Sequence, residues 1–524
     1  MTYTIGISSG IFGAVRGAEP RERMEYLGIS RKIHYSLYKG VMFNQIDIES
    51  ITEFLEPKLK EHVDSMKKLG VTFGFHGETA AFGGREAIYL DSTIEDEYKR
   101  SHERVIISLK HSGELGATYY LLHSSETFPF IRLRFQLQPL MLVDVFGRPF
   151  DQFLREKPEL LEWVVKQDFI VELLGWYYRN AKGEYLVEKV GRERKPTEEE
   201  ENEAKKYAVC QVVRSNEETY GAERAAYFIV AKWMEMQKDP LWIKICGKNV
   251  EEYEKRTGDK IGDMSMDNPK FREKENYQLW VPAVSAKYIW GHLNPLPGNE
   301  YEDPKKILEK YKIYLPFETP MAPPGFEKLV RLARPLHIHF LTEECNSKYI
   351  CTAWDFEHIL SAYIEPDKEI DALPKNAGER IKVFHLGWPS PLAPSHVPIP
   401  LGSEQQLTIY EWLFKLRKKG FKDGFLIFER GGGKDPVQDT IVVLRLIAKY
   451  LEKDVPPKEL PEEFFGISPT LPASEKRQWV EIFHHAMDPL KGMLKIPEEQ
   501  WTFLGTAAKE EGKRPEEWKK EEYR

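Results

Sequence analysis

Hydrophobic and polar positions alternate along the first quarter of the chain in short blocks that predict strands and longer blocks that predict helices. YTIGIS (residues 3–8) and VMFNQIDI (41–48) have the composition of buried strands. ITEFLEPKLKEHVDSMKKLG (51–70) has apolar residues at helical spacing and ends in a glycine, which is typical of a helix C-terminus. VTFGFHGE (71–78) and ATYYLLHSSE (117–126) are the next strand candidates. This alternation predicts βα units and a parallel sheet.

The pattern becomes irregular and mostly helical from about residue 128 to 330, and then the βα alternation returns. The later strand candidates are PLHIHFLTEE (335–344), KYICTAWD (348–355), RIKVFHLG (380–387) and DGFLIFE (423–429). Strands near residues 5, 45, 73, 120, 340, 352, 383 and 427 predict a closed (β/α)8 barrel. An open doubly wound sheet is less consistent with the sequence, because no GxGxxG motif follows the first strand.

We therefore expect an α/β protein, a (β/α)8 TIM barrel with a large, mainly helical insertion after strand four. The barrel halves are assigned to residues 1–127 and 335–454, and the insertion to residues 128–334. Residues 455–524 are assigned to a helical C-terminal extension. A chain of 524 residues is long enough for one large domain together with an insertion of this kind.

Composition and charge narrow the class of protein. The chain is 41% hydrophobic and 30% charged, as in globular proteins, and its Lys and Glu bias is common in thermophiles. A formal net charge of −8 argues against extensive non-specific binding to nucleic acid. The four cysteines form no CxxC pair, and there is neither a signal peptide nor a membrane-length apolar stretch. These features predict a cytoplasmic protein that does not enter a membrane.

Ionisable residues end six consecutive predicted strands. They are His76, His123, Glu343 or Glu344, Asp355 with His358 just beyond it, His385 and Glu429, and His396 lies in the loop after strand seven. Each residue alone has an ordinary explanation, such as Asp355 capping the helix that follows it. Together they would bury many ionisable groups at one end of the barrel, which is costly unless something compensates it. Because imidazole and carboxylate are normal ligands of divalent cations, the joint pattern predicts a metal site.

These strand ends resemble those of the xylose-isomerase-like barrel superfamily, and most closely those of endonuclease IV. The motifs are FGFHGE, LLHSSE, WDFEH, VFHLG and IFER, and the resemblance covers residues 1–127 and 335–452. It implies a first metal held by His76, His123 and the strand-five glutamate. It implies a second metal held by that glutamate with Asp355, His385 and Glu429, and a third held by His358 and His396. The expected metal is Zn²⁺, with Mn²⁺ or Mg²⁺ as alternatives.

Two details qualify the resemblance. The sugar epimerases of the superfamily have ExxN at strand five, which Glu343 and Asn346 match, so Glu343 is preferred and Glu344 stays open. The endonuclease IV motif DRH is replaced here by Pro394-Ser395-His396, so the carboxylate ligand of the third metal is missing. Two metals are therefore expected rather than three.

The resemblance leaves two enzymatic functions to weigh. The first is a metal-dependent hydrolase of endonuclease IV type that acts on a phosphodiester or phosphate ester, with abasic-site DNA as one substrate. In it, Glu343 would bridge two metals, and Glu429 would orient or deprotonate the attacking water. Arg430 would neutralise substrate charge, with an outward salt bridge as its alternative role. The second is a metal-dependent sugar isomerase or epimerase, in which Glu343 and Glu429 would move a proton next to a carbonyl. We favour the hydrolase at this point over the isomerase and over a non-enzymatic scaffold.

Overall fold

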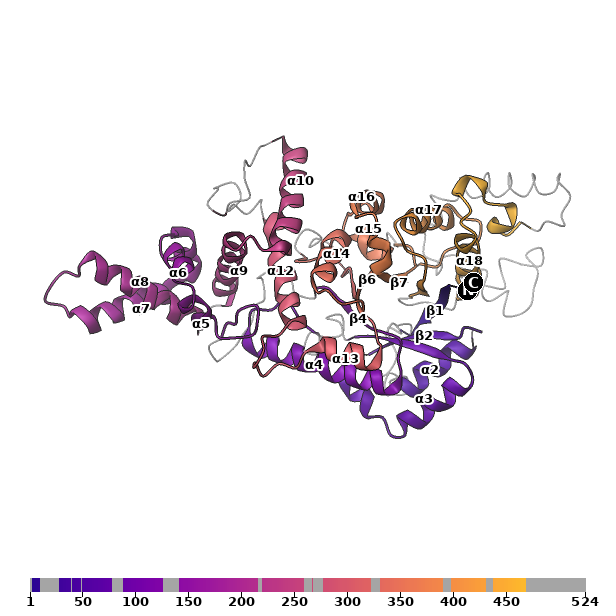
Figure 1. Cartoon of the computed structure of the whole chain (residues 1–524), viewed down its shortest axis with the longest axis horizontal. Helices are drawn as coiled ribbons and strands as arrows, with labels where there is room; N and C mark the ends of the chain where they lie inside the picture. The colour runs from indigo at the N-terminus through magenta and orange to yellow at the C-terminus, as the bar shows by residue number, and fades with distance from the viewer. Residues whose placement is uncertain are drawn as a thin grey trace, which may run out of the picture.

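Eight parallel strands close into a barrel in chain order, from β1 to β8 (Figure 1). The computed structural model describes residues 2–9, 28–38, 40–48, 50–77, 88–125, 141–214, 219–258, 266, 277–321, 330–389, 397–429 and 437–467. The strands are β1 Tyr3–Ser8, β2 Phe43–Asp47, β3 Thr72–His76, β4 Tyr120–His123, β5 Leu315–Glu318, β6 Ile350–Asp355, β7 Ile381–His385 and β8 Gly424–Phe428. The expected TIM barrel is therefore confirmed.

Helices of the barrel lie between successive strands and outside them. They are α2 Ile29–Tyr38, α3 Leu59–Lys68, α4 Glu95–Leu115, α13 Pro304–Tyr311, α14 Pro335–Glu344, α15 Phe356–Ser361, α16 Pro366–Ala372, α17 Glu404–Lys418 and α18 Val437–Glu452. Short 3-10 helices lie in two connections, at Ile51–Leu55 and Ala377–Arg380. Two more, Pro457–Glu459 and Glu462–Phe465, follow α18 at the start of the segment assigned to the C-terminal extension. Beyond residue 467, the expected C-terminal extension lies outside the described residues.

The helical insertion follows β4 and extends away from the barrel, with α7 and α8 at its far end (Figure 1). Its elements are α5 Phe150–Arg155, α6 Pro158–Val164, α7 Asp168–Val190, α8 Glu198–Arg214, α9 Thr219–Met236, the π-helical turn η4 Trp242–Cys246, α10 Gly247–Thr257 and α12 Tyr277–Leu293. Helix α12 is buried on nearly all sides and packs against α9, η4 and α14. It therefore joins the core of the insertion to the barrel.

The fifth strand is not where the sequence pattern suggested. The segment PLHIHFLTEE forms α14, and the strand is the tetrapeptide LPFE of β5, which pairs in parallel with β4 and β6. Every side chain from Pro335 to Thr342 is buried, so this helix lacks the polar face that reveals a 3.6-residue period. The barrel consequently resumes at α13 and β5, inside the segment 128–334 that we assigned to the insertion.

A capped helix turn leads into β5. Asp303 precedes α13 and its side chain accepts a hydrogen bond from the Lys305 backbone N–H, while Pro304 occupies the first helical position. Lys312 then adopts a left-handed conformation at φ 55°, which ends the helix. Ile313 and Leu315 are fully buried, so this short connection directs the chain back into the barrel wall.

The inside of the barrel is layered. Phe43, Tyr119, Leu121, Ala353, Val383 and Ile427 form a small apolar cluster separate from the main core. Polar and ionisable side chains lie at the carboxyl ends of the strands, where the register places Asp47 beside His76, His123 beside Glu318, and Asp355 beside His385. Because the strands are parallel, these residues share one rim of the barrel.

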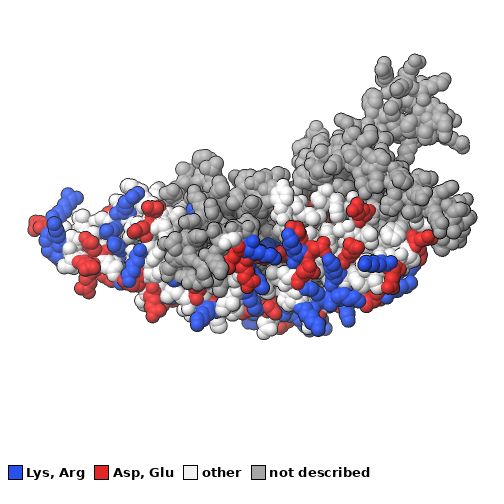
Figure 2. Space-filling view, turned by 90° about the horizontal axis from the view of Figure 1, so that it is seen from above, with Lys and Arg blue, Asp and Glu red and all other residues white. Residues whose placement is uncertain are grey.

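The described surface carries both signs of charge. Basic and acidic side chains are interspersed across the face seen in Figure 2. In the described part of the chain, no helix combines the length and the apolar character needed to cross a membrane. Cys210, Cys246, Cys345 and Cys351 are buried free thiols, which fits the absence of a disulfide framework in the sequence.

Gly291 of α12 offers a test of how the insertion packs. A Cβ atom at this position would lie 1.6 Å from the backbone carbonyl oxygen of Val145, so Gly291→Ala must force the two segments apart. Overpacking of this kind costs about 1–3 kcal/mol, and backbone atoms cannot rotate away as side chains do. We expect Gly291→Ala to lower the free energy of unfolding by at least that amount in chemical denaturation.

Gly183 of α7 is the matched control, because nothing lies within 4 Å of a Cβ built there. Gly183→Ala in this exposed helix should stabilise the helix by about 0.5–1 kcal/mol. Equal effects of the two substitutions would contradict the close approach of α12 to the 142–149 segment.

Candidate metal centre

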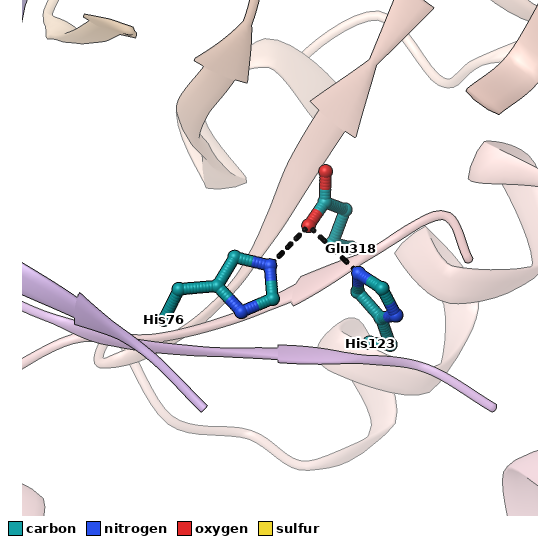
Figure 3. A group of neighbouring side chains, drawn as sticks. All are labelled: His76, His123 and Glu318. Carbon is teal, nitrogen blue, oxygen red and sulfur yellow. Dashed lines mark hydrogen bonds and ion pairs between the residues drawn. The ribbon is translucent and has the colours of Figure 1, made fainter. Parts of the chain in front are cut away.

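Six ionisable side chains from the ends of β3 to β8 meet at the barrel rim, and they form two overlapping groups. In each group, every member offers one ligand atom within 4.8 Å of the others. The first group is His76, His123 and Glu318 (Figure 3), and the second is Glu318, Asp355, His385 and Glu429. Glu318, the last residue of β5, belongs to both groups and is fully buried.

Glu318 is surrounded by imidazole nitrogens. Its Oε2 atom lies 3.2 Å from Nε2 of His76 and 3.5 Å from Nε2 of His123. Its Oε1 atom lies 2.5 Å from Nδ1 of His385 and 3.8 Å from Nδ1 of His358. One carboxylate thus joins side chains that come from β3, β4, β7 and the start of α15.

His385 is the centre of the second group. Its Nδ1 atom lies 2.5 Å from Oε1 of Glu318, 2.5 Å from Oε2 of Glu429 and 3.7 Å from Oδ2 of Asp355. Three carboxylates around a single ring nitrogen concentrate negative charge at one point inside a protein. A divalent cation bound by the same atoms would neutralise that charge directly.

Asp355 combines the two roles that the sequence left open. Its Oδ1 atom accepts the hydrogen bond of the His358 backbone N–H at 2.9 Å, which caps α15. Its other oxygen, Oδ2, lies near His385 and is 3.7 Å from Nε2 of His358. Helix capping and participation in the rim group therefore use different oxygens of one carboxylate.

Backbone carbonyls fix the orientation of two histidine rings. Nδ1 of His76 donates to the carbonyl of Gly77 at 2.9 Å, and Nδ1 of His358 donates to the carbonyl of Thr319 at 2.9 Å. A carbonyl can only accept a hydrogen bond, so Nδ1 carries a proton in both rings and Nε2 is left to face the rim. Metal-binding histidines are usually held by an outer hydrogen bond of this kind.

Burial and neighbouring charges shift the pKa values of these groups in opposite directions. Burial alone lowers the pKa of His76, but the hydrogen bond and charge of Glu318 outweigh it and raise that pKa to about 9. The pKa of His385 is lowered by burial, yet the charges of Glu318 and Glu429 raise it well above its usual range. Burial raises the pKa of Glu318, but the charge of His385 and hydrogen bonds from His385 and His76 hold it well below its usual range. Without a metal, protons on His76 and His385 therefore offset the negative charge of the carboxylates.

The predicted strand-five ligand does not reach the rim. Glu343 lies on α14 with its side chain 44% exposed, and its Oε2 atom is 2.8 Å from Nζ of Lys244. Glu344 lies on the same helix, 3.7 Å from the same ammonium group. Glu318 occupies the place in the group that the sequence assigned to Glu343. His396 and Arg430, which the sequence also singled out, lie outside the described residues.

Sequence reasoning missed two polar residues of β2 in addition to Glu318. Asp47 ends β2 at the same rim, and Ser8 donates to its Oδ2 atom at 2.8 Å. Burial raises the pKa of Asp47, while the charge of His76 opposes that effect. The strand-end rule that selected the other residues applies equally to Asp47 in VMFNQIDI. Gln45, two residues earlier, points into the barrel, where its Oε1 atom accepts a hydrogen bond from His385.

Comparisons with known proteins find similarity at the level of structure. No protein-family model matches the sequence, and no curated protein matches it. A D-tagatose 3-epimerase-like protein aligns with 86% of this chain and 98% of its own, at 11% identity and a TM-score of 0.40. D-psicose 3-epimerase from Clostridium cellulolyticum H10 covers 86% of this chain and 95% of its own, at 11% identity and a TM-score of 0.37. The IolI protein with a bound zinc atom covers 87% of this chain and 99% of its own, at 8% identity and a TM-score of 0.38.

The expected metal-dependent hydrolase is contradicted by these comparisons, in which similar structures are D-psicose 3-epimerase, L-ribulose 3-epimerase and 3-keto-D-glucoside 4-epimerase. A closer kinship to endonuclease IV than to the rest of the superfamily is likewise not supported. Identities this low describe the fold alone, so the activity has to be argued from the rim residues. The closed barrel of eight parallel strands gives the chain the fold of a (β/α)8 TIM barrel.

Proposed function

We propose that the protein is a metal-dependent sugar isomerase or epimerase that works at the barrel rim. The observation that carries this proposal is the position of two carboxylates at one ring nitrogen of His385. Glu318 of β5 and Glu429, which follows β8, each place an oxygen 2.5 Å from Nδ1 of the same imidazole. Two carboxylates held this close together are suited to exchange a proton with one small substrate from two sides.

The donor set fits a divalent cation. Glu318, Asp355, His385 and Glu429 offer three carboxylates and one imidazole, and His76 and His123 add two imidazoles to the shared Glu318. Zn²⁺ accepts all of these ligands, and carboxylate-rich sites also suit Mn²⁺. When bound by these residues, the ion would polarise the carbonyl of a keto-sugar and make the adjacent C–H more acidic.

The chain itself supplies the proton transfers. One of the two glutamates takes a proton from the carbon next to the sugar carbonyl, and the other returns a proton to the opposite face of that carbon. The substrate is neither oxidised nor reduced, and the two glutamates exchange protonation states in each turnover. Glu318 is held ionised by His385 and His76, so it is ready to act as the base.

Asp355 and the histidines keep this geometry in place. Asp355 is fully buried and anchored by its cap on α15, so its free oxygen has little freedom to move. His358 lies beside it with Nδ1 fixed on Thr319, which directs Nε2 towards the rim. In the proposed reaction His358 binds hydroxyl groups of the sugar.

The proposed reaction can be followed by solvent exchange. Protein loaded with Mn²⁺ or Co²⁺ would be incubated in D₂O with D-tagatose, D-psicose or D-fructose, and NMR would report deuterium at the carbon next to the carbonyl together with any new epimer. We expect Glu318→Gln and Glu429→Gln each to slow exchange by about 10²- to 10⁴-fold, because each removes a general acid–base group. Glu343→Gln is the matched control.

Glu343 is a glutamate of the same type that the sequence pattern favoured, but it is ion-paired to Lys244 away from the rim. Its substitution should leave the exchange rate unchanged. If the metal-loaded wild-type protein exchanges no carbon-bound proton in any of these sugars, the isomerase proposal is wrong. An equal loss in Glu343→Gln and Glu318→Gln would also contradict it.

Metal binding should release protons near neutral pH. The pKa of His76 is about 9 in the metal-free protein, so at pH 7 this imidazole is protonated and a cation must displace its proton. The affinity for metal should therefore rise with pH towards pH 9, by about tenfold per pH unit for each proton released. Calorimetry in two buffers of different ionisation enthalpy measures the number of protons.

The variant His76→Ala should release fewer protons than the wild type at pH 7. His111→Ala is the control, since His111 lies on α4 near Glu114 and outside the rim groups. Metal binding without proton release, or with the same release in His76→Ala, would contradict the assignment of His76 as a ligand.

A further inference from the structure

Gln45 is a buried amide that contacts a member of the proposed metal group from inside the barrel. It lies on β2 and is fully buried, as are His385 and Tyr119. Its Oε1 atom accepts hydrogen bonds from Nε2 of His385 at 2.8 Å and from the Tyr119 hydroxyl at 2.9 Å. Tyr119 belongs to the apolar cluster inside the barrel and His385 to the ionisable group at the rim, so Gln45 connects the two layers.

The orientation of this amide follows from its other contact. The amide nitrogen of Gln45 donates to Oδ1 of Asp47 at 3.4 Å, and a carboxylate can only accept. The amide nitrogen therefore faces Asp47 and the amide oxygen faces His385. Asp47 is held in turn by Ser8, whose hydroxyl donates to Oδ2 at 2.8 Å, and by Ser9, which accepts from the Asp47 backbone N–H at 2.9 Å.

The amide oxygen determines which nitrogen of His385 carries a permanent proton. An amide oxygen accepts only, so Nε2 of His385 must donate and stays protonated. Nδ1 is then the nitrogen that faces Glu318 and Glu429, and its proton is the one that a cation can replace. Burial raises the pKa of Tyr119 well above its usual range, so the phenol stays neutral and keeps donating to the same oxygen.

We propose that Gln45 is a positioning residue that holds His385 in its metal-binding tautomer and ring orientation. The inference rests on the proposed function only in taking His385 as a metal ligand. It adds β2, whose residues were absent from the predicted site, to the elements that set metal affinity. Outer hydrogen-bond partners of metal-binding histidines typically change metal affinity by about 10- to 100-fold when they are lost.

Gln45→Leu is the direct test, because leucine fills a similar volume and removes the acceptor. Asn44→Leu is the matched control on the same strand. Asn44 is equally buried, but its amide donates to the backbone carbonyl of Lys32 and does not contact His385. Both substitutions remove a buried amide and both should lower stability, so stability alone does not separate a positioning role from a structural one.

Metal affinity and the tautomer of His385 separate the two roles. Competition with a chromophoric chelator would give the dissociation constant for Zn²⁺ or Mn²⁺, and ¹⁵N-histidine NMR of the metal-free and loaded proteins would report the Nε2–H of His385. We expect Gln45→Leu to weaken metal binding by about 10- to 100-fold and to change this resonance, while Asn44→Leu leaves both as in the wild type. Tyr119→Phe should have a smaller effect in the same direction, because it removes only the second donor to Gln45.

Wild-type metal affinity together with an unchanged Nε2–H resonance in Gln45→Leu would overturn the inference, as would equal losses of affinity in Gln45→Leu and Asn44→Leu. Its failure is distinguishable from failure of the proposed function. If the loaded wild type turns over no sugar but Gln45→Leu still loses metal affinity, the isomerase proposal fails and the role of Gln45 stands. If the wild type binds no metal at saturating concentrations, the inference fails together with the assignment of His385 as a metal ligand.

Discussion

The buried carboxylate of Glu318 is the interaction on which the rim of this barrel depends. It carries negative charge in a place that water does not reach, and three imidazoles lie within 3.5 Å of its oxygens. Burying a charge costs several kcal/mol unless it is paired and hydrogen-bonded, so these histidines and this glutamate require one another. The same arrangement brings imidazole nitrogens and carboxylate oxygens together, and these are the ligand atoms that divalent cations bind.

The insertion does not separate the two strands that flank it, because β4 and β5 pair directly at the rim. His123 and Glu318 are direct neighbours in the paired strands β4 and β5, although the whole insertion separates them along the chain. The insertion is tied to this edge by Asp91, whose Oδ2 atom accepts from Ser125 just after β4 and from Ser285 of α12. Buried polar contacts therefore anchor α12 of the insertion to the chain segment that follows β4.

Much of the fold was predictable from the sequence, because seven of the eight strands carry an apolar run that ends in a recognisable polar residue. The barrel and the rim positions of His76, His123, Asp355, His385 and Glu429 follow from that pattern.

The fifth strand was not predictable in this way. LPFE is too short to show a period, and residues 335–342 of the nearby α14 are buried on all sides, so their sequence resembles a buried strand. The pairing of LPFE with β4 and β6 is a tertiary contact that the local sequence does not indicate. This pairing places Glu318 at the rim and leaves Glu343 on α14. The role of Gln45 depends on contacts between strands far apart in the chain, so it appears only in the folded structure.

Anomalous diffraction from crystals grown with Zn²⁺ or Mn²⁺ would test the central claim most directly. The account predicts an anomalous peak bound by Glu318, Asp355, His385 and Glu429, with ligand distances of about 2.0–2.2 Å for zinc. A second peak between His76, His123 and Glu318 would show that Glu318 bridges two ions. A peak at Glu343 and Lys244, or no peak at the rim at saturating metal, would contradict the account.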